Sequence, residues 1–209
     1  MKLFDFIVVL IIVSGLAACC DAKPAEKSEL TSLHGTMITM LSEDKGHAME
    51  IWAKGDNVRA ESSDDTRKTI IIQLGDTMYT YGTDAKKGMK QRFASGLASM
   101  GLIKQIATIK SKGKKESTRE IEGVVYEQYS YEESRDASTD VWFEAKSSLP
   151  SIWLSAIKTG EKEISVLKMR YRDMEANVDV ADELFKLPRD VIFSEERAVD
   201  ASQKTQGSR

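Results

Sequence analysis

Apolar and polar residues alternate in short runs after residue 30, and turn residues separate the runs. A period of two is typical of antiparallel strands that bury one face. The run Thr69–Leu74 contains three consecutive isoleucines, so we expect it to be a central strand. In all, the pattern predicts a five-stranded meander over Leu33–Leu41, His47–Lys54, Asn57–Ser62, Thr69–Leu74 and Thr77–Tyr81.

The alternation also assigns the two faces of a strand, because successive side chains point to opposite sides of a sheet. In the second strand, one face carries Met49, Ile51 and Ala53, and the other carries Glu50, Trp52 and Lys54. We expect the first set to face the core.

The alternation stops after Asp84, and apolar residues then recur at helical spacing as far as Ala107. Gly96 and Gly101 each lower helix propensity by about 1 kcal/mol relative to alanine. We therefore predict one soft or broken amphipathic helix. Its apolar face is expected to carry Met89, Phe93, Leu97, Met100, Ile103 and Ile106.

Strand-like alternation returns after Gly113 and continues through most of the remaining chain. The predicted strands are Glu116–Ile121, Val124–Tyr131, Thr139–Ala145, Ser151–Ile157 and Glu161–Asp173. A sheet of about ten or eleven strands coils rather than staying flat. The predicted fold class is therefore mainly β (α+β), a curved antiparallel half-barrel with a helix covering its concave face.

The N-terminus has a different pattern, in which the apolar run Phe6–Val13 precedes Leu16-Ala17-Ala18-Cys19. This combination is typical of a secretory signal that ends at a lipoprotein cleavage site. The apolar segment of about 13 residues is shorter than the roughly 20 that span a bilayer. We expect attachment through a lipid on Cys19 to a membrane of the cell envelope, with the outer membrane favoured over the inner.

These observations divide the chain into four parts. We predict a signal peptide over 1–18, the lipidated cysteine and a tether over 19–29, one domain over 30–193, and a disordered tail over 194–209.

The catalytic inventory of the chain is poor. The net charge of −3 gives no electrostatic basis for binding nucleic acid. Cys19 and Cys20 are the only cysteines, and His34 and His47 are the only histidines. The chain contains no glycine-rich phosphate loop and no Gly-x-Ser-x-Gly motif. We therefore expect neither an enzyme nor a protein with a cofactor or metal.

Three blocks of sequence, in this order and spacing, carry a family resemblance. The first is an apolar-Trp-x-Lys strand followed by an aromatic hairpin, the second is a strand before Leu-Pro, and the third is a closing Phe-x-x-Pro. The first block occupies Ile51–Arg59 and Ile72–Tyr81. The second occupies Trp142–Ala145 and Leu149-Pro150, and the third occupies Leu184–Pro188. The chain thereby resembles the LolA/LolB-like lipoprotein-localisation superfamily. The resemblance implies an eleven-stranded unclosed barrel, plugged by helices, whose interior holds the acyl chains of lipoproteins.

The chain also departs from that family. The soluble carrier of the family has an arginine and a proline after the strand that matches Ile51–Lys54, and the arginine latches the lid. Gly55 and Asp56 occupy these positions here, so that latch is missing. The resemblance therefore supports the fold more than the activity.

Two hypotheses of function follow from different faces of the sheet. In the first, lipid or lipoprotein acyl chains bind in an apolar cavity between sheet and helix, driven by burial of apolar surface. Besides the helix residues, its lining is expected to include Met37, Met49, Ile51, Val58, Ile71 and Met78.

In the second hypothesis, the cavity is filled by the protein's own side chains, and the chain is a sensory or protein-interaction module. An envelope protein partner would then bind an exposed aromatic face, because solvated faces seldom carry several large aromatic residues. That face is expected to carry Trp52, Tyr79, Tyr81 and Trp142.

Overall fold

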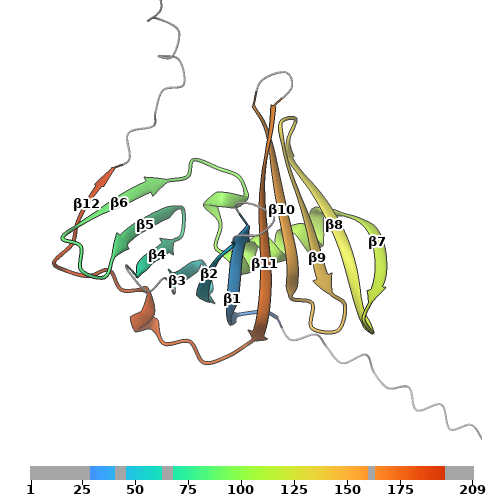
Figure 1. The fold of residues 1–209 in the computed structure, drawn as a ribbon, viewed down its shortest axis with the longest axis horizontal. Helices are drawn as coiled ribbons and strands as arrows, with labels where there is room; N and C mark the ends of the chain where they lie inside the picture. The colour runs from blue at the N-terminus through green and yellow to red at the C-terminus, as the bar shows by residue number, and fades with distance from the viewer. Residues whose placement is uncertain (1–28, 41–45, 63–67, 160–162, 196–209) are drawn as a thin grey trace, which may run out of the picture.

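The computed structural model describes residues 29–40, 46–62, 68–159 and 163–195 (Figure 1). The predicted signal peptide, Cys19, nearly all of the tether and most of the predicted tail lie outside the described residues. The described part forms one sheet of twelve strands with a single α-helix. The predicted fold class, a mainly β, open and curved antiparallel sheet with a helix on its concave face, is confirmed.

The described elements follow one another along the chain as two meanders separated by the helical segment. Their bounds are β1 (Ser32–Met40), β2 (Gly46–Lys54), β3 (Asn57–Ser62), β4 (Thr69–Leu74), β5 (Thr77–Gly82), β6 (Lys87–Arg92), η1 (Leu97–Ser99), α1 (Leu102–Lys112), β7 (Lys114–Ile121), β8 (Val124–Ser134), β9 (Ala137–Glu144), β10 (Pro150–Thr159), β11 (Glu163–Ala176), η2 (Asp182–Phe185) and β12 (Ile192–Glu195).

The order of strands across the sheet is β12-β6-β5-β4-β3-β2-β1-β11-β10-β9-β8-β7. The two meanders therefore meet where β1 pairs with β11, and Met37 lies opposite both Tyr171 and Met49 at that seam. β12 pairs in parallel with β6, and the other neighbours are antiparallel. β7 and β12 form the two edges of the sheet, so the barrel is unclosed.

Two strands, β6 and β12, were not predicted from the alternation. β6 has the sequence KGMKQR, which has no regular apolar–polar alternation, and it lies next to the edge strand β12. β12 is four residues long and extends two residues beyond the expected end of the domain at residue 193.

The predicted helix from Met89 to Ala107 is wrong at its N-terminal end. Met89 lies in β6 opposite Thr80, and its side chain is half exposed. A 3₁₀ turn, η1, follows Gly96, and α1 starts only after Gly101. The glycines that we expected to soften one helix separate a strand, a 3₁₀ turn and a shorter helix.

The main core lies between α1 and the concave face of the sheet. Buried Leu102, Ile103, Ile106 and Ile109 on α1 pack in one cluster with residues of both meanders. The sheet contributes Leu33, Met49, Ile51, Ala53, Ala60, Val141, Phe143, Trp153 and Tyr171 to this cluster. Met49, Ile51 and Ala53 thus lie on the inner face, as the alternation predicted.

A second core lies on the convex face, under the C-terminal segment from η2 to β12 (Figure 1). Ile70 and Ile72 are buried there, while Ile71 points to the opposite, concave face. The Phe193 ring packs edge-on against Tyr79 and Tyr81, with centroids 5.1 and 5.8 Å apart. The isoleucine run is apolar throughout because both faces of β4 are covered.

Phe193 covers part of the aromatic face that we expected to be exposed, so that prediction is corrected. Tyr81 is buried and Tyr79 is partly buried beneath Phe193, and Trp52 stacks on His34 at 5.4 Å. Trp142 on β9 remains partly exposed. The aromatic side chains on the outward face of β5 therefore pack against Phe193 of the same chain.

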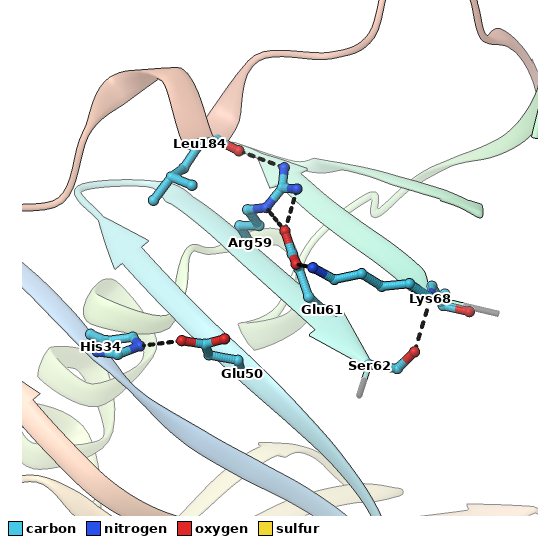
Figure 2. A network of polar contacts seen from close by, with 8 residues as sticks. His34, Glu50, Arg59, Glu61, Ser62, Lys68 and Leu184 are labelled. Atoms are coloured by element: carbon cyan, nitrogen blue, oxygen red, sulfur yellow. Dashed lines mark hydrogen bonds and ion pairs between the residues drawn. The ribbon is translucent and has the colours of Figure 1, made fainter. Parts of the chain in front are cut away.

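A buried ion-pair network also ties the C-terminal segment to the convex face (Figure 2). Glu61 is only 8% exposed and forms ion pairs with both Arg59 and Lys68. Arg59 also donates a hydrogen bond from Nη1 to the Leu184 carbonyl at 2.8 Å. Burial raises the pKa of the Glu61 carboxyl, but hydrogen bonds from Lys68 and Arg59 outweigh it, so this pKa lies below its usual value.

We expect Phe193→Ala to lower the free energy of unfolding by about 3 kcal/mol, because it removes the aromatic cover of β5 and leaves a cavity. The neighbouring Ile192→Ala is the control, since Ile192 is 73% exposed and its loss should cost no more than about 0.5 kcal/mol. Urea denaturation of both variants measures this difference. Equal losses of unfolding free energy in the two variants would show that the second core does not stabilise the sheet.

Stability should also fall with acid through Glu61. A lowered folded pKa contributes stability above the unfolded pKa, and this contribution disappears as the pH falls through the folded value. Glu61→Gln leaves Arg59 without its carboxylate and should cost about 3 kcal/mol at neutral pH. Urea unfolding of both proteins should show this difference shrinking below about pH 4.5. A difference that stays constant down to about pH 2 would contradict the assignment.

Candidate functional site

A cavity of about 450 Å³ lies between the concave face of the sheet and the η1–α1 segment. This volume is within the usual range of small-ligand sites. Its walls come from both meanders, with Ile51, Ile71 and Met78 on one side and Trp153 and Met169 on the other. Leu97 and Leu102 form its cover. The cavity is largely apolar.

The structure brings together many of the residues predicted to line a cavity, although two of them come from different elements than expected. Those at the cavity are Met37, Ile51, Val58, Ile71, Met78, Phe93 and Leu97. Phe93 lies in the connection after β6 and Leu97 in η1, so neither belongs to the α-helix that we predicted.

The other predicted lining residues lie elsewhere. Ile103 and Ile106 border a separate hollow of about 440 Å³ on the other side of α1. Met49 borders a third hollow beside His34, and Met89 is exposed on β6. Met100 packs against the main core, where Thr108 Oγ1 lies 3.7 Å from its sulfur. Because α1 starts at Leu102, its faces point differently from those of a helix that starts at Met89.

Our sequence analysis missed the contribution of β10 and β11. Trp153, Leu167, Met169 and Tyr171 all line the cavity, and Trp153 and Tyr171 are buried. Leu167, Met169 and Tyr171 alternate with polar residues along a strand that we did predict, whereas Trp153 lies between Ile152 and Leu154. A facing assignment for that strand, as for the second strand, would have found those three residues.

The cavity has an apolar rim toward the end of the sheet where β10 ends and β11 begins. Ile157 and Leu167 are 53% and 44% exposed there. The N-terminal end of the domain is at the opposite end of β11, where Leu33 pairs with Ala176 (Figure 1). The chain therefore enters the domain at one end of the sheet, and the rim lies at the other.

Polar contacts hold η1 over the cavity. The Leu97 backbone N–H donates to Glu133 Oε1 at 2.5 Å, and Gln73 Nε2 donates to the carbonyls of Ala98 and Met100 at 3.1 Å. Gly96 has φ of 86°, and a Cβ atom there would lie 1.8 Å from Glu133 Oε1. Glycine is therefore required where η1 meets β8.

The start of α1 is fixed against the turn between β2 and β3. Lys104 Nζ lies 2.5 Å from Asp56 Oδ2, and a Cβ atom at Gly101 would lie 2.6 Å from the Asp56 backbone. The family's arginine is absent from this turn, as the sequence shows. Here a turn carboxylate pairs with a helix lysine, so the turn and α1 are joined by an ion pair.

Few polar side chains lie within the cavity. Trp153 Nε1 donates to Ser155 Oγ at 3.0 Å, and this oxygen is 3.3 Å from Thr139 Oγ1. Burial raises the pKa of the Tyr171 phenol, so it is neutral at physiological pH. Within the described ranges, no cluster of three or more His, Cys, Asp or Glu side chains could hold a metal ion. No α-helix in that part of the chain has the length and apolarity to span a bilayer.

Comparison with known proteins gives matches in structure only. No protein-family model matches the chain, and a search of curated proteins finds no match either. Among solved structures, the chain is similar to an uncharacterized conserved protein from Thermus thermophilus. That match has a TM-score of 0.52 and 7% identity, and covers 79% of this chain and 91% of that chain.

Two further matches have lower TM-scores. A chain of the Pseudomonas aeruginosa MucA/MucB complex gives 0.44 at 11% identity, covering 78% of this chain and 57% of that chain. A LolA superfamily protein from Nitrosomonas europaea gives 0.37 at 10% identity, covering 77% and 91%.

At such low identities a structural likeness shows the fold alone. The open curved sheet with a helix over its concave face is the architecture that the LolA/LolB-like resemblance implied. The class defined by fold and site is therefore an open, curved half-barrel with an apolar cavity.

We expect Glu133→Ala to loosen η1 while leaving the sheet intact. A hydrogen bond to a charged acceptor contributes about 1.5 kcal/mol, so its loss should speed hydrogen exchange of the Leu97 amide by about tenfold. The exposed neighbour Glu132 is the control, and Glu132→Ala should leave this exchange rate unchanged. Unaltered exchange at Leu97 in Glu133→Ala would show that the carboxylate does not hold η1.

Proposed function

We propose that this protein binds acyl chains or lipids in the cavity beneath η1 and α1, as a binding protein rather than an enzyme. The observation that carries the proposal is an apolar space of about 450 Å³ that the protein's own side chains leave unfilled. Burial of apolar ligand surface there is favourable by about 25 cal/mol per Å². Met37, Met78 and Met169 on its walls can adapt to chains of different length.

The proposed location is the cell envelope, with a lipid on Cys19 as the membrane anchor and the outer membrane as the favoured site. The signal sequence and the residues before Cys19 support this part of the proposal. The tether would join the domain at the end of the sheet opposite the exposed Ile157 and Leu167. The cavity rim would then face away from the anchoring membrane, which suits a role in lipid or lipoprotein trafficking.

The alternative, a sensory or protein-interaction module with a filled cavity, has less support. The unfilled volume argues against a filled cavity, and Phe193 covers the aromatic residues expected to form the interaction face. An envelope protein partner stays a prediction, and the exposed apolar rim is the surface that we propose for it.

Native mass spectrometry of the mature protein, produced with Cys19→Ser so that no lipid is attached, tests the proposal. We expect co-purified lipid or fatty acid, and an apolar fluorophore that added lipid displaces. Ala60→Leu fills part of the cavity wall and should weaken fluorophore binding about tenfold, which corresponds to roughly 1.4 kcal/mol. Ala107→Leu, on the exposed side of α1, is the control.

A protein that carries no ligand, ignores added lipid and takes up no fluorophore would overturn the proposal. Equal fluorophore binding by folded Ala60→Leu would place the dye outside this cavity.

A further inference from the structure

A small hydrogen-bonded polar group lies on the wall of the largely apolar cavity. It consists of the Thr139 hydroxyl on β9, and the Ser155 hydroxyl and Trp153 indole on β10. Thr139 is 3% exposed, and Ser155 lies directly opposite it in the β9–β10 pair. Ile157 of the rim is two residues further along β10. The group therefore lies on the cavity wall just inside the rim.

The hydrogen-bond count of this group leaves one donor over. The Trp153 N–H donates to Ser155 Oγ, and the two hydroxyls form one bond with each other. That bond uses one of their two protons, because each hydroxyl carries one donor. These are the side-chain bonds of the two hydroxyls among the described residues, so one hydroxyl proton has no acceptor. Thr139 is buried and Ser155 is half-buried on the cavity wall, so this donor is available to a ligand that accepts a hydrogen bond.

The charges around the cavity indicate what kind of acceptor fits. Among the described residues that line the cavity, none is a lysine, arginine or histidine, whereas the carboxylate of Glu133 is part of the lining. A free fatty-acid carboxylate would have no positively charged partner in this cavity. It would also share the apolar space with the negatively charged Glu133 side chain. A neutral carbonyl oxygen meets the spare hydroxyl proton without that cost.

We infer that the Thr139–Ser155 pair recognises the carbonyl oxygen of a neutral, ester-linked acyl chain, and that the cavity selects such esters over free fatty acids and plain hydrocarbons. This inference rests on the proposed lipid-binding function and gives it a substrate class. Thr139 or Ser155 donates to the ester carbonyl, while the acyl chain lies along the apolar wall.

Displacement of an apolar fluorophore from the mature protein, again with Cys19→Ser, tests the inference with three competitors. These are methyl dodecanoate, dodecanoate and tetradecane, and we expect methyl dodecanoate to bind most tightly. The double variant Thr139→Val/Ser155→Ala removes both hydroxyls and should weaken binding of methyl dodecanoate about tenfold, and of tetradecane by no more than about twofold. Thr139→Val alone leaves the Ser155 hydroxyl as a donor and should keep most of the ester affinity. Thr139→Ser keeps the hydroxyl and should keep the ester affinity. Ser138→Ala is the control, because Ser138 lines the same cavity but forms no side-chain hydrogen bond among the described residues.

Infrared spectroscopy of carbonyl-labelled methyl dodecanoate provides a second readout, which can be made on the wild type. The carbonyl stretch should lie at lower frequency when bound to the wild type than in hydrocarbon solvent, and should return toward the solvent value in Thr139→Val/Ser155→Ala. A solvent-like frequency in the wild type, or equal losses of ester and hydrocarbon affinity in Thr139→Val/Ser155→Ala, would overturn the inference and leave lipid binding standing. Failure of all three competitors to displace the fluorophore would overturn both proposals.

Discussion

The pairing of β1 with β11 is the constraint on which the rest of the structure depends. It runs from Leu33 opposite Ala176 to Met40 opposite Lys168, and it joins segments more than a hundred residues apart in the chain. Without this seam each meander would have one more open edge, and neither would enclose a space by itself. The seam makes one curved sheet whose concave face is wide enough to leave a cavity beneath a single helix.

The two faces of the sheet are covered in different ways. On the convex face the C-terminal segment packs Phe193 and Leu187 onto β4 and β5, and the Glu61 network fastens it by buried charge. On the concave face α1 covers only part of the sheet, and η1 crosses the remaining space through polar contacts to Gln73 and Glu133. The convex face is therefore covered over β4 and β5, whereas the concave face keeps free volume.

The two segments that cover the cavity, α1 and η1, are held in place by different kinds of contact. α1 is held by a buried apolar face and by the Asp56–Lys104 ion pair at its start. η1 is held by buried Leu97 and by hydrogen bonds between side chains and its backbone, and it lies between two glycines. Hydrogen bonds at a partly exposed site exchange with water at small net cost, whereas buried apolar contacts do not. η1 therefore depends more on polar contacts than α1 does.

The sequence by itself determined the strands with clear alternation, the faces of β2 and the curved, mainly β architecture. A period of two and a single buried face are local properties that each strand carries in its own residues. Only the tertiary structure decided where Met89 and Ile103 point, because Gly96 and Gly101 set the start of α1 through contacts with Glu133 and Asp56. It also decided that Phe193 covers Tyr79 and that Thr139 meets Ser155 inside the cavity. These contacts join residues distant in the chain, and their partners follow from strand order, which no local pattern encodes.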